Sequence, residues 1–372
     1  MKKTLAILLA LALAMATLLT GCGGSGDEGG ENADAALKVG YIFIGAINDG
    51  GFTQSMYEGA VAAKEHFAGS MDFLYVENIN DGDASASTDA AVNLIDQGCN
   101  VIVGCSYGYM DSLDALANSG DYDDVTFLHF SGNKKNDTNF DNWFGSMEQA
   151  RYLTGMAAAA VAEKGVVGYV AAHPYTEVQI GINAFTLGAQ AVNPDIEVKV
   201  VYIGTWGDAE IEKTAAEQLI NAGAEVVCYH ADSTATQIAA AEAGDVYAIG
   251  WNYPQNDCGD LYLTAAYWNT ENYFIPTFQA IMDGTWTPKS HYGTMETGLI
   301  AVDEISDAVP AEVKAEIEAV KAEMEAGTFN VFEGPIYYND GTVLCEEGQV
   351  LDRAGIWSIV KEIKGVTATS NK

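Results

Sequence analysis

The stretch KVGYIFIGAINDGGFTQSMYEG (38–59) contains, in order, an apolar run, a polar loop with two glycines and the start of a helical pattern. A continuous apolar run is typical of a strand buried on both faces of a parallel sheet. A strand with one face exposed to solvent would instead alternate apolar and polar residues. Glycine and short polar residues favour a turn from strand to helix. The stretch therefore predicts one strand–loop–helix unit of an α/β protein.

The same unit recurs along the chain in two sets of four strands and three helices. The strand-like runs are KVGYIFIGA (38–46), MDFLYVEN (71–78), NVIVGCSY (100–107) and VTFLHFSG (125–132), then GVVGYVAA (165–172), EVKVVYIG (197–204), EVVCYHAD (225–232) and DVYAIGWN (245–252). The helices are expected around 53–67, 84–97, 111–119, 177–192, 208–222 and 233–243. About 330 residues exceed one comfortable core, so the repetition predicts two similar lobes.

About 120 residues follow the second set of strands and helices, and they must belong to one lobe or the other. It offers a helix at 270–284, a strand-like ETGLIAV (296–302), an acidic helix at 309–327 and a hairpin around Asn339-Asp340-Gly341. A chain that returns to the first lobe and then recrosses makes three hinge strands, the arrangement of type I periplasmic binding proteins. We expect lobe 1 at 37–145 with about 253–290 returning, and lobe 2 at 146–252 with about 291–372.

The N-terminal residues have the pattern of a signal peptide for export. Two lysines precede an apolar run at 5–19, which is the length of a signal-peptide core and short for a membrane span. The run ends in LTGC (19–22), the lipobox pattern of bacterial lipoproteins. We therefore expect a signal peptide at 1–21 and fatty acylation of Cys22, for example with palmitate, which would anchor the chain to the outer face of the cell membrane. The polar stretch that follows predicts a flexible tether at 22–36.

Charge and cysteine content exclude several classes of partner and site. The formal charge is −35, and it becomes −37 when Lys2 and Lys3 leave with the signal peptide, which excludes nucleic acid as a partner. Five cysteines remain after Cys22, an odd number without CxxC spacing, which argues against a disulfide framework and a zinc site. One pair remains free to oxidise outside the cell. The remaining cysteines are Cys99, Cys105, Cys228, Cys258 and Cys345.

The sequence argues against catalysis. His230, Asp232 and Ser233 lie too close together on one strand end to form a relay, and no G-x-S-x-G elbow occurs. No dinucleotide or phosphate-loop motif occurs either, so we expect neither a cofactor nor a metal. His173 is expected to be a hinge-loop residue, and Arg151 is expected to pair with carboxylates near the first crossing between lobes.

In open α/β sheets the ligand lies beyond the carboxyl ends of the strands. The loops at those ends are rich in aromatic and amide side chains, and we take them as the candidate site. They span 48–52, 107–109, 173–177, 205–208, 230–233 and 251–256, and include the candidates Tyr107, Glu177 and Asp232.

Several long segments resemble, in order, the basic membrane protein family of ABC importers, which includes purine nucleoside receptor lipoproteins and purine-base binders. The resemblance covers about 37–300. The segments are GYIFIGAINDGGFTQSMYEG (40–59), GCSYGYMDSLDALA (104–117), GINAFTLGAQAVNPDIEVKVVYIGTW (181–206), HADST (230–234) and LTAAYWNTENYFIPTFQAIMDGTW (263–286).

The resemblance implies that two aromatic residues sandwich a purine, and the matching positions here are Phe52 and Trp206. It also implies recognition of the base edges by Asp49, Thr53 and Gln54 in the first loop. The chain departs from the nucleoside receptors at Thr53, where they carry Asn. It departs again at Asn252, where they carry an acid, and at YWN (267–269), around Trp268, where they carry a lysine. Because the acid and the lysine serve the ribose, their loss favours a free base.

The sequence thus predicts a monomeric, non-enzymatic solute-binding lipoprotein that captures a purine base or nucleoside between its lobes. It would deliver the small molecule to an ABC permease and ATPase complex. The alternative is a sugar-binding protein of the same fold, since sugar sites also stack aromatic rings.

Overall fold

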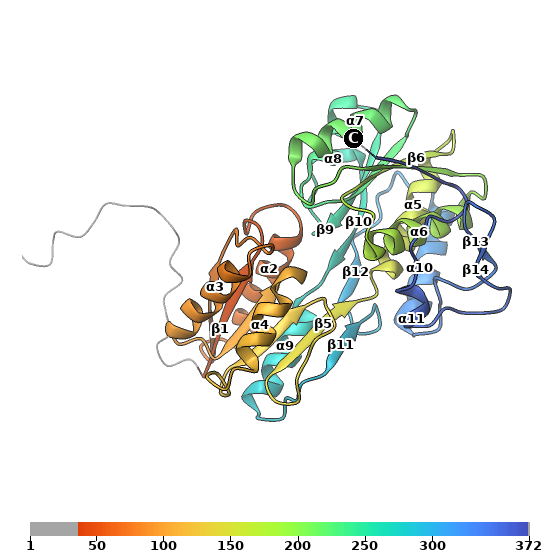
Figure 1. Cartoon of the computed structure of the whole chain (residues 1–372). Coiled ribbons are helices and arrows are strands. Elements are labelled where there is room, and N and C mark those ends of the chain that lie inside the picture. The colour runs from red at the N-terminus through yellow and green to blue at the C-terminus, as the bar shows by residue number, and fades with distance from the viewer. Residues whose placement is uncertain (1–35, 371–372) are drawn as a thin grey trace, which may run out of the picture. The chain divides into compact units, whose positions relative to one another are not determined.

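Two parallel sheets with flanking helices form the body of the protein, and the computed structural model describes residues 36–370 (Figure 1). The predicted signal peptide, Cys22 and residues 22–35 of the predicted tether lie outside this range. Among the described residues no helix is long and apolar enough to cross a membrane. All five cysteines of this part of the chain are buried and free.

The first sheet has six strands in the order β11-β5-β4-β3-β1-β2, all parallel. Its strands are β1 (Leu37–Phe43), β2 (Met71–Val76), β3 (Val101–Cys105), β4 (Thr126–Phe130), β5 (Phe140–Gly145) and β11 (Ser290–Gly293). Its helices are α2 (Phe52–His66), α3 (Ala84–Asp96), the 3-10 turn η1 (Tyr107–Tyr109), α4 (Met110–Ala117) and α9 (Glu271–Met282).

Alternate residues of β1 face opposite layers, which is why its apolar run is continuous. Tyr41 packs with Phe274 of α9, in the core that also holds Met56 of α2. Ile42 belongs to the second core, with Leu94 of α3 and Leu113 of α4. Both faces of the first sheet are therefore buried against helices, as the sequence predicted.

The second sheet has seven strands in the order β12-β10-β9-β8-β6-β7-β15, parallel except for β12, which is antiparallel to β10. Its strands are β6 (Val166–Ala171), β7 (Glu197–Tyr202), β8 (Val226–His230), β9 (Tyr247–Asn252), β10 (Tyr262–Trp268), β12 (Ile300–Val302) and β15 (Val366–Ser370). The remaining elements are α5 (Met147–Val161), α6 (Thr176–Val192), α7 (Ala209–Asn221), α8 (Ala235–Ala243), η2 (Gly259–Leu261), α10 (Ala311–Glu325), β13 (Ile336–Tyr337), β14 (Val343–Cys345) and α11 (Arg353–Ile356).

The chain passes between the two sheets three times, after β5, after β10 and after β11. The first and third crossings lie side by side, because the backbone N–H of Ser146 donates to the carbonyl oxygen of Gly293 over 2.8 Å. The second crossing packs directly on α2. There a Cβ on Gly59 would collide with Thr270, so this close approach needs glycine.

One sequence expectation needs correction, and some strands were not predicted. β10 belongs to the second sheet, so the return to the first lobe begins after Trp268 and not at about 253. β5 was not predicted, because Asp141 and Asn142 interrupt its apolar pattern. Both are buried and bonded, Asp141 with Tyr273 and Asn142 with the carbonyl of Gly132. β15 was also missed, and it adds an edge strand beside β7. The predicted hairpin is confirmed as β13–β14.

Candidate functional site

Loops from the two sheets meet at the carboxyl ends of the strands. A Cβ on Gly51, in the loop after β1, would lie 2.9 Å from the carbonyl oxygen of Asp232, in the loop after β8. A Cβ on Gly50 would lie 2.9 Å from the methyl carbon of Thr234. Since any larger side chain would force these loops apart, the two glycines set how closely the two halves of the candidate site approach.

The first loop uses its predicted polar residues to build itself. The Asp49 carboxylate accepts hydrogen bonds from the backbone N–H groups of Gly51, Thr53 and Gln54 at 2.8–3.0 Å, and so caps the start of α2. The hydroxyl of buried Thr53 accepts from Gly45 N–H, and the side-chain carbonyl of Gln54 accepts from Gly50 N–H. Burial raises the pKa of Asp49, although the hydrogen bonds from Gln54, Gly51 and Thr53 oppose part of this rise. All three residues therefore shape the loop, which presents Phe52.

The two predicted stacking residues are both half-buried. Phe52, the first residue of α2, packs against Phe130 at the end of β4, with ring centres 4.9 Å apart. Trp206 lies in the loop after β7, where its backbone carbonyl accepts from the N–H of Asp232 over 2.7 Å. This backbone bond joins the Trp206 loop to the Asp232 loop.

Three predicted residues form a hydrogen-bonded chain. The indole N–H of Trp268 donates to Asn252 Oδ1 over 3.1 Å, and Asn252 Nδ2 donates to Asp232 Oδ1 over 3.2 Å. Asn252 ends β9 with φ of +65°, a left-handed conformation that asparagine tolerates better than most residues. Because Trp268 occupies the amide oxygen, the amide nitrogen is directed at the carboxylate.

Carboxyl groups gather around Asp232. Burial raises the pKa of Asp232 well above its ordinary value, and the nearby charges of Asp49, Glu212 and Glu177 raise it further. Burial alone raises the pKa of Glu177, in the first turn of α6, to about 7. No described cationic side chain forms an ion pair with these acids, so the group favours a ligand that donates hydrogen bonds over an anion.

Glu212 belongs to this group and was missed by the sequence analysis. Its side chain is fully buried beneath Ser233, whose hydroxyl donates to Oε2 over 2.8 Å. Burial raises its pKa to about 7. The helical pattern of α7 contained the signal, because Glu212 shares a face with the buried Ala215, Ala216 and Leu219 at spacings of three, four and seven.

Other aromatic residues extend the site in the second lobe. His173 stacks on Tyr175 at 4.9 Å and meets Trp206 edge-on at 5.4 Å, so the predicted hinge-loop histidine lies beside one of the two predicted stacking residues. Burial lowers the pKa of His173, which favours the neutral imidazole. Tyr107, in contrast, is 64% exposed at the start of η1 and is not drawn into the buried group.

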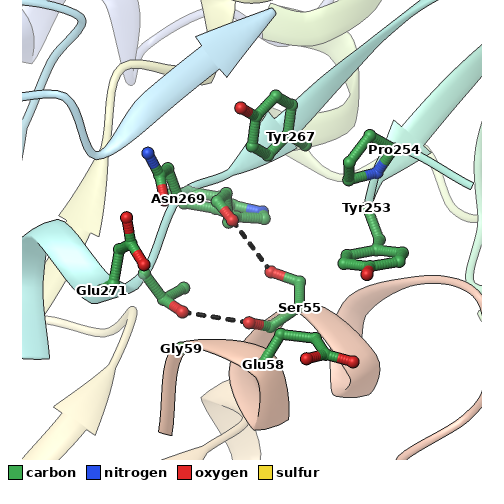
Figure 2. Close-up of a pocket in the computed structure, with 10 residues that line it drawn as sticks. Ser55, Glu58, Gly59, Tyr253, Pro254, Tyr267, Asn269 and Glu271 are labelled. Atoms are coloured by element: carbon green, nitrogen blue, oxygen red, sulfur yellow. Dashed lines mark hydrogen bonds between the residues drawn. The ribbon is translucent and has the colours of Figure 1, made fainter. Parts of the chain in front are cut away.

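A small hollow of about 100 Å³ lies beside the second crossing, between α2 and the end of β10 (Figure 2). The hydroxyl of Ser55 donates to the carbonyl of Trp268, and the hydroxyl of Thr270 donates to the carbonyl of Ser55. Of the predicted site residues only Trp268 lines this hollow. It is therefore a feature of the crossing and not the candidate ligand site.

Comparison with known proteins identifies the family. The chain is 33% identical to a purine-binding protein of Brucella abortus, over 77% of this chain and 80% of that one. It is 32% identical to a putative ABC transporter glucose-binding protein of Haloferax volcanii, over 79% of this chain and 73% of that one. A solute-binding protein of an ABC transporter system from Conexibacter woesei shares the fold, with a TM-score of 0.68 and 22% identity, over 79% of this chain and 98% of that one.

A family model described as ABC transporter substrate-binding protein, PnrA-like, matches residues 36–331. This match spans all three crossings and both sheets except the edge strand β15. Proteins of this family bind solutes and are not enzymes. The chain belongs to the Bmp family of PnrA-like ABC transporter substrate-binding proteins.

Proposed function

We propose that this extracytoplasmic substrate-binding protein captures a free purine base between its lobes and hands it to an ABC permease. In this proposal Phe52 and Trp206 cover the two faces of the ring, while Asp232, Asn252 and Glu177 serve its edge. The protein works as a monomer, anchored to the membrane through acylated Cys22.

One observation carries the choice of a base over a nucleoside. Asn252 is held by Trp268 and directs its amide at Asp232, so this position, where the nucleoside receptors carry an acid, offers an amide instead. In this proposal the second oxygen of Asp232 accepts a hydrogen bond from the ligand. A free purine has a ring N–H that attachment of ribose removes, and a buried acceptor discriminates strongly against a ligand that lacks its donor.

A sugar is the second candidate, and the cluster of acidic side chains around Asp232 favours it. Glu177 and Asp232 are acceptors that suit hydroxyl donors as well as ring N–H groups. The relative from Haloferax volcanii carries the name of a putative glucose-binding protein, and the relative from Brucella abortus that of a purine-binding protein. The flat, half-buried rings of Phe52 and Trp206 favour the heterocycle.

Calorimetry on the ligand-free protein separates these candidates. We expect adenine, guanine, hypoxanthine or xanthine to bind at least tenfold more tightly than its nucleoside, and glucose and pentoses to bind more weakly still. A tenfold preference for the nucleoside would contradict the choice of a base, and tighter binding of a sugar would contradict the purine. Mass spectrometry of material released by denaturing freshly purified protein checks the identity independently.

A further inference from the structure

A cavity of about 180 Å³ lies in the first lobe, between helix α9 and the strands β5 and β11 (Figure 1). Its residues from the two strands, Asp141 and His291, stand near the amino ends of β5 and β11. The candidate ligand site, in contrast, gathers at the carboxyl ends of the strands. The cavity is therefore a separate space, with room for a molecule roughly the size of benzene.

A buried carboxyl group forms part of the cavity wall. Asp141 is only 1% exposed, and the hydroxyl of Tyr273 donates to its Oδ1 over 3.4 Å. Burial raises the pKa of Asp141 to about 7, although the hydrogen bond from Tyr273 and the charge of Lys289 oppose part of this rise. A ligand ammonium group close to this carboxyl would favour its charged form and be attracted to it in turn.

Pro276 adds a second hydrogen-bond acceptor on the same side. It lies inside α9 and lines the cavity together with Asn272. Because proline has no N–H, the backbone carbonyl of Asn272, four residues earlier, lacks the helical hydrogen bond that it would otherwise accept. The side of the cavity formed by β5 and α9 thus offers a carboxylate and a backbone carbonyl to a hydrogen-bond donor.

Lys289 supplies the opposite charge. It stands just before β11, lines the cavity and forms no ion pair with a carboxylate of residues 36–370. Burial lowers the pKa of His291, and the charge of Lys289 lowers it further, which keeps this imidazole neutral. The side of the cavity formed by β11 thus offers a cation and a neutral ring that can donate a hydrogen bond.

Arg151 shows the contrasting case of a cation without an ion pair. It is fully buried in the second lobe, and no carboxylate among residues 36–370 pairs with it. The expectation that it pairs with carboxylates near the first crossing is therefore wrong. Its Nη2 donates to the Tyr229 carbonyl over 2.9 Å, and its guanidinium carbon lies 3.4 Å from the centre of the Trp251 ring. These contacts hold Arg151 within the core, whereas Lys289 lines a cavity.

We propose that the cavity lined by Asp141, Asn272, Pro276, Lys289 and His291, the α9 cavity, binds a free α-amino acid with a small side chain. The ligand ammonium group donates to the Asp141 carboxylate and the Asn272 carbonyl, and the ligand carboxylate accepts from Lys289 and His291. An amino acid carries both charges on one carbon, which matches an acid and a cation that line one small cavity. Since α9 follows the second crossing and β11 leads into the third, the ligand joins two segments that enter the hinge. The proposal is independent of which solute binds between the lobes.

The first test titrates the purified protein with glycine, alanine and serine by calorimetry and by ligand-observed NMR. We expect saturable binding at one site and a melting temperature that rises with amino-acid concentration, because the ligand binds only the folded chain. Acetate and methylamine each carry one of the two charges, and each should bind at least about tenfold more weakly than glycine. Failure of all three amino acids to bind, or acetate or methylamine binding as tightly as glycine, would overturn the proposal.

Two variants localise the binding. Lys289→Gln removes the cation from an exposed position and should weaken glycine binding about tenfold or more. Ala280→Leu fills part of the cavity and should abolish binding. Lys164→Gln, at an exposed position of the second lobe, is the matched control and should bind glycine like the wild type. If Ala280→Leu does not fold, Lys289→Gln still decides, because glycine affinity unchanged in that variant would refute this location.

Discussion

Arg353 and Glu148 form an ion pair across 205 positions of the chain, with Nη1 and Oε1 3.0 Å apart. Arg353 also donates to the Ser146 hydroxyl over 2.7 Å and lies 3.5 Å from the ring centre of Tyr292. It therefore touches the first crossing and the strand that leads to the third. Arg353 stands beyond residue 331, where the match to the family ends, so a late segment of the chain secures the hinge region.

Arg353→Met should destabilise the protein by about 1–3 kcal/mol in denaturant melts, because the Glu148 side chain is only 7% exposed and would lose its partner. The loss is smaller than for a fully buried pair, since the Arg353 side chain is 40% exposed. Adding Glu148→Gln should recover part of the loss. Lys361→Met is the control, because it breaks an exposed pair with Asp340 and should therefore leave stability nearly unchanged. Equal losses in the two single variants would contradict this explanation.

Glu212→Gln should change how stability depends on pH. The unfolded chain releases the Glu212 proton near pH 4.5, while burial raises the pKa in the folded protein to about 7. The folded state thus holds an extra proton across that window, and the contribution of Glu212 to stability falls as pH rises through it. Glutamine does not titrate, so the variant should gain about 1–3 kcal/mol relative to wild type between pH 4.5 and 7.

Denaturant melts at several pH values measure this gain. Glu316→Gln, at an exposed position of α10, is the matched control and should follow the wild-type curve. Parallel curves for wild type and Glu212→Gln would show that burial does not hold the proton on Glu212.

Phe52→Ala and Trp206→Ala should each weaken ligand binding by roughly 1–3 kcal/mol, about five- to 150-fold in affinity. If both rings flank the ligand, their effects should be coupled and not simply additive. Calorimetry on the single and double variants measures the coupling, with Tyr337→Ala as an exposed aromatic control. A purely packing role would instead lower the stability of the unliganded protein by roughly 3–5 kcal/mol and leave affinity unchanged.

Cys22→Ser should release the protein from the membrane, because the thiol is the predicted site of acylation. Labelled palmitate should enter the wild-type chain and not the variant, and fractionation should find the variant in the soluble extract. Cys345→Ser is the control, since Cys345 is buried and should not affect labelling. Continued labelling of the Cys22 variant would show that the lipobox interpretation is wrong.

The sequence predicted the elements whose patterning is local. Buried parallel strands such as β1, β3 and β8 are recognisable as apolar runs, and the Asn-Asp-Gly turn predicts the hairpin of β13 and β14. Helix α9 was predicted within two residues at each end, even though Pro276 lies inside it. These predictions succeeded because each depends on residues within about fifteen positions of one another.

Partners far along the chain decided the rest. A carboxylate such as Asp141 is not expected in a buried strand. It is accommodated because the hydroxyl of Tyr273, 132 positions later, donates a hydrogen bond to it. The sheet to which β10 belongs depends on its pairing with β9, and its own composition suits either sheet. Asp49 has the composition of a ligand-binding residue, yet the loop folds its carboxylate onto three backbone N–H groups.

By itself, the sequence determined that this chain folds as two helix-covered parallel sheets and that its polar and aromatic loops gather at the strand ends. Both follow from the period of its hydrophobic pattern and from the direction of parallel strands. Only the tertiary structure decided that Asn252 directs its amide at Asp232, that Glu212 joins the buried acids and that Arg151 lies in the core without a carboxylate. Burial and charge compensation depend on every group around an atom, and those groups come together only when distant segments pack.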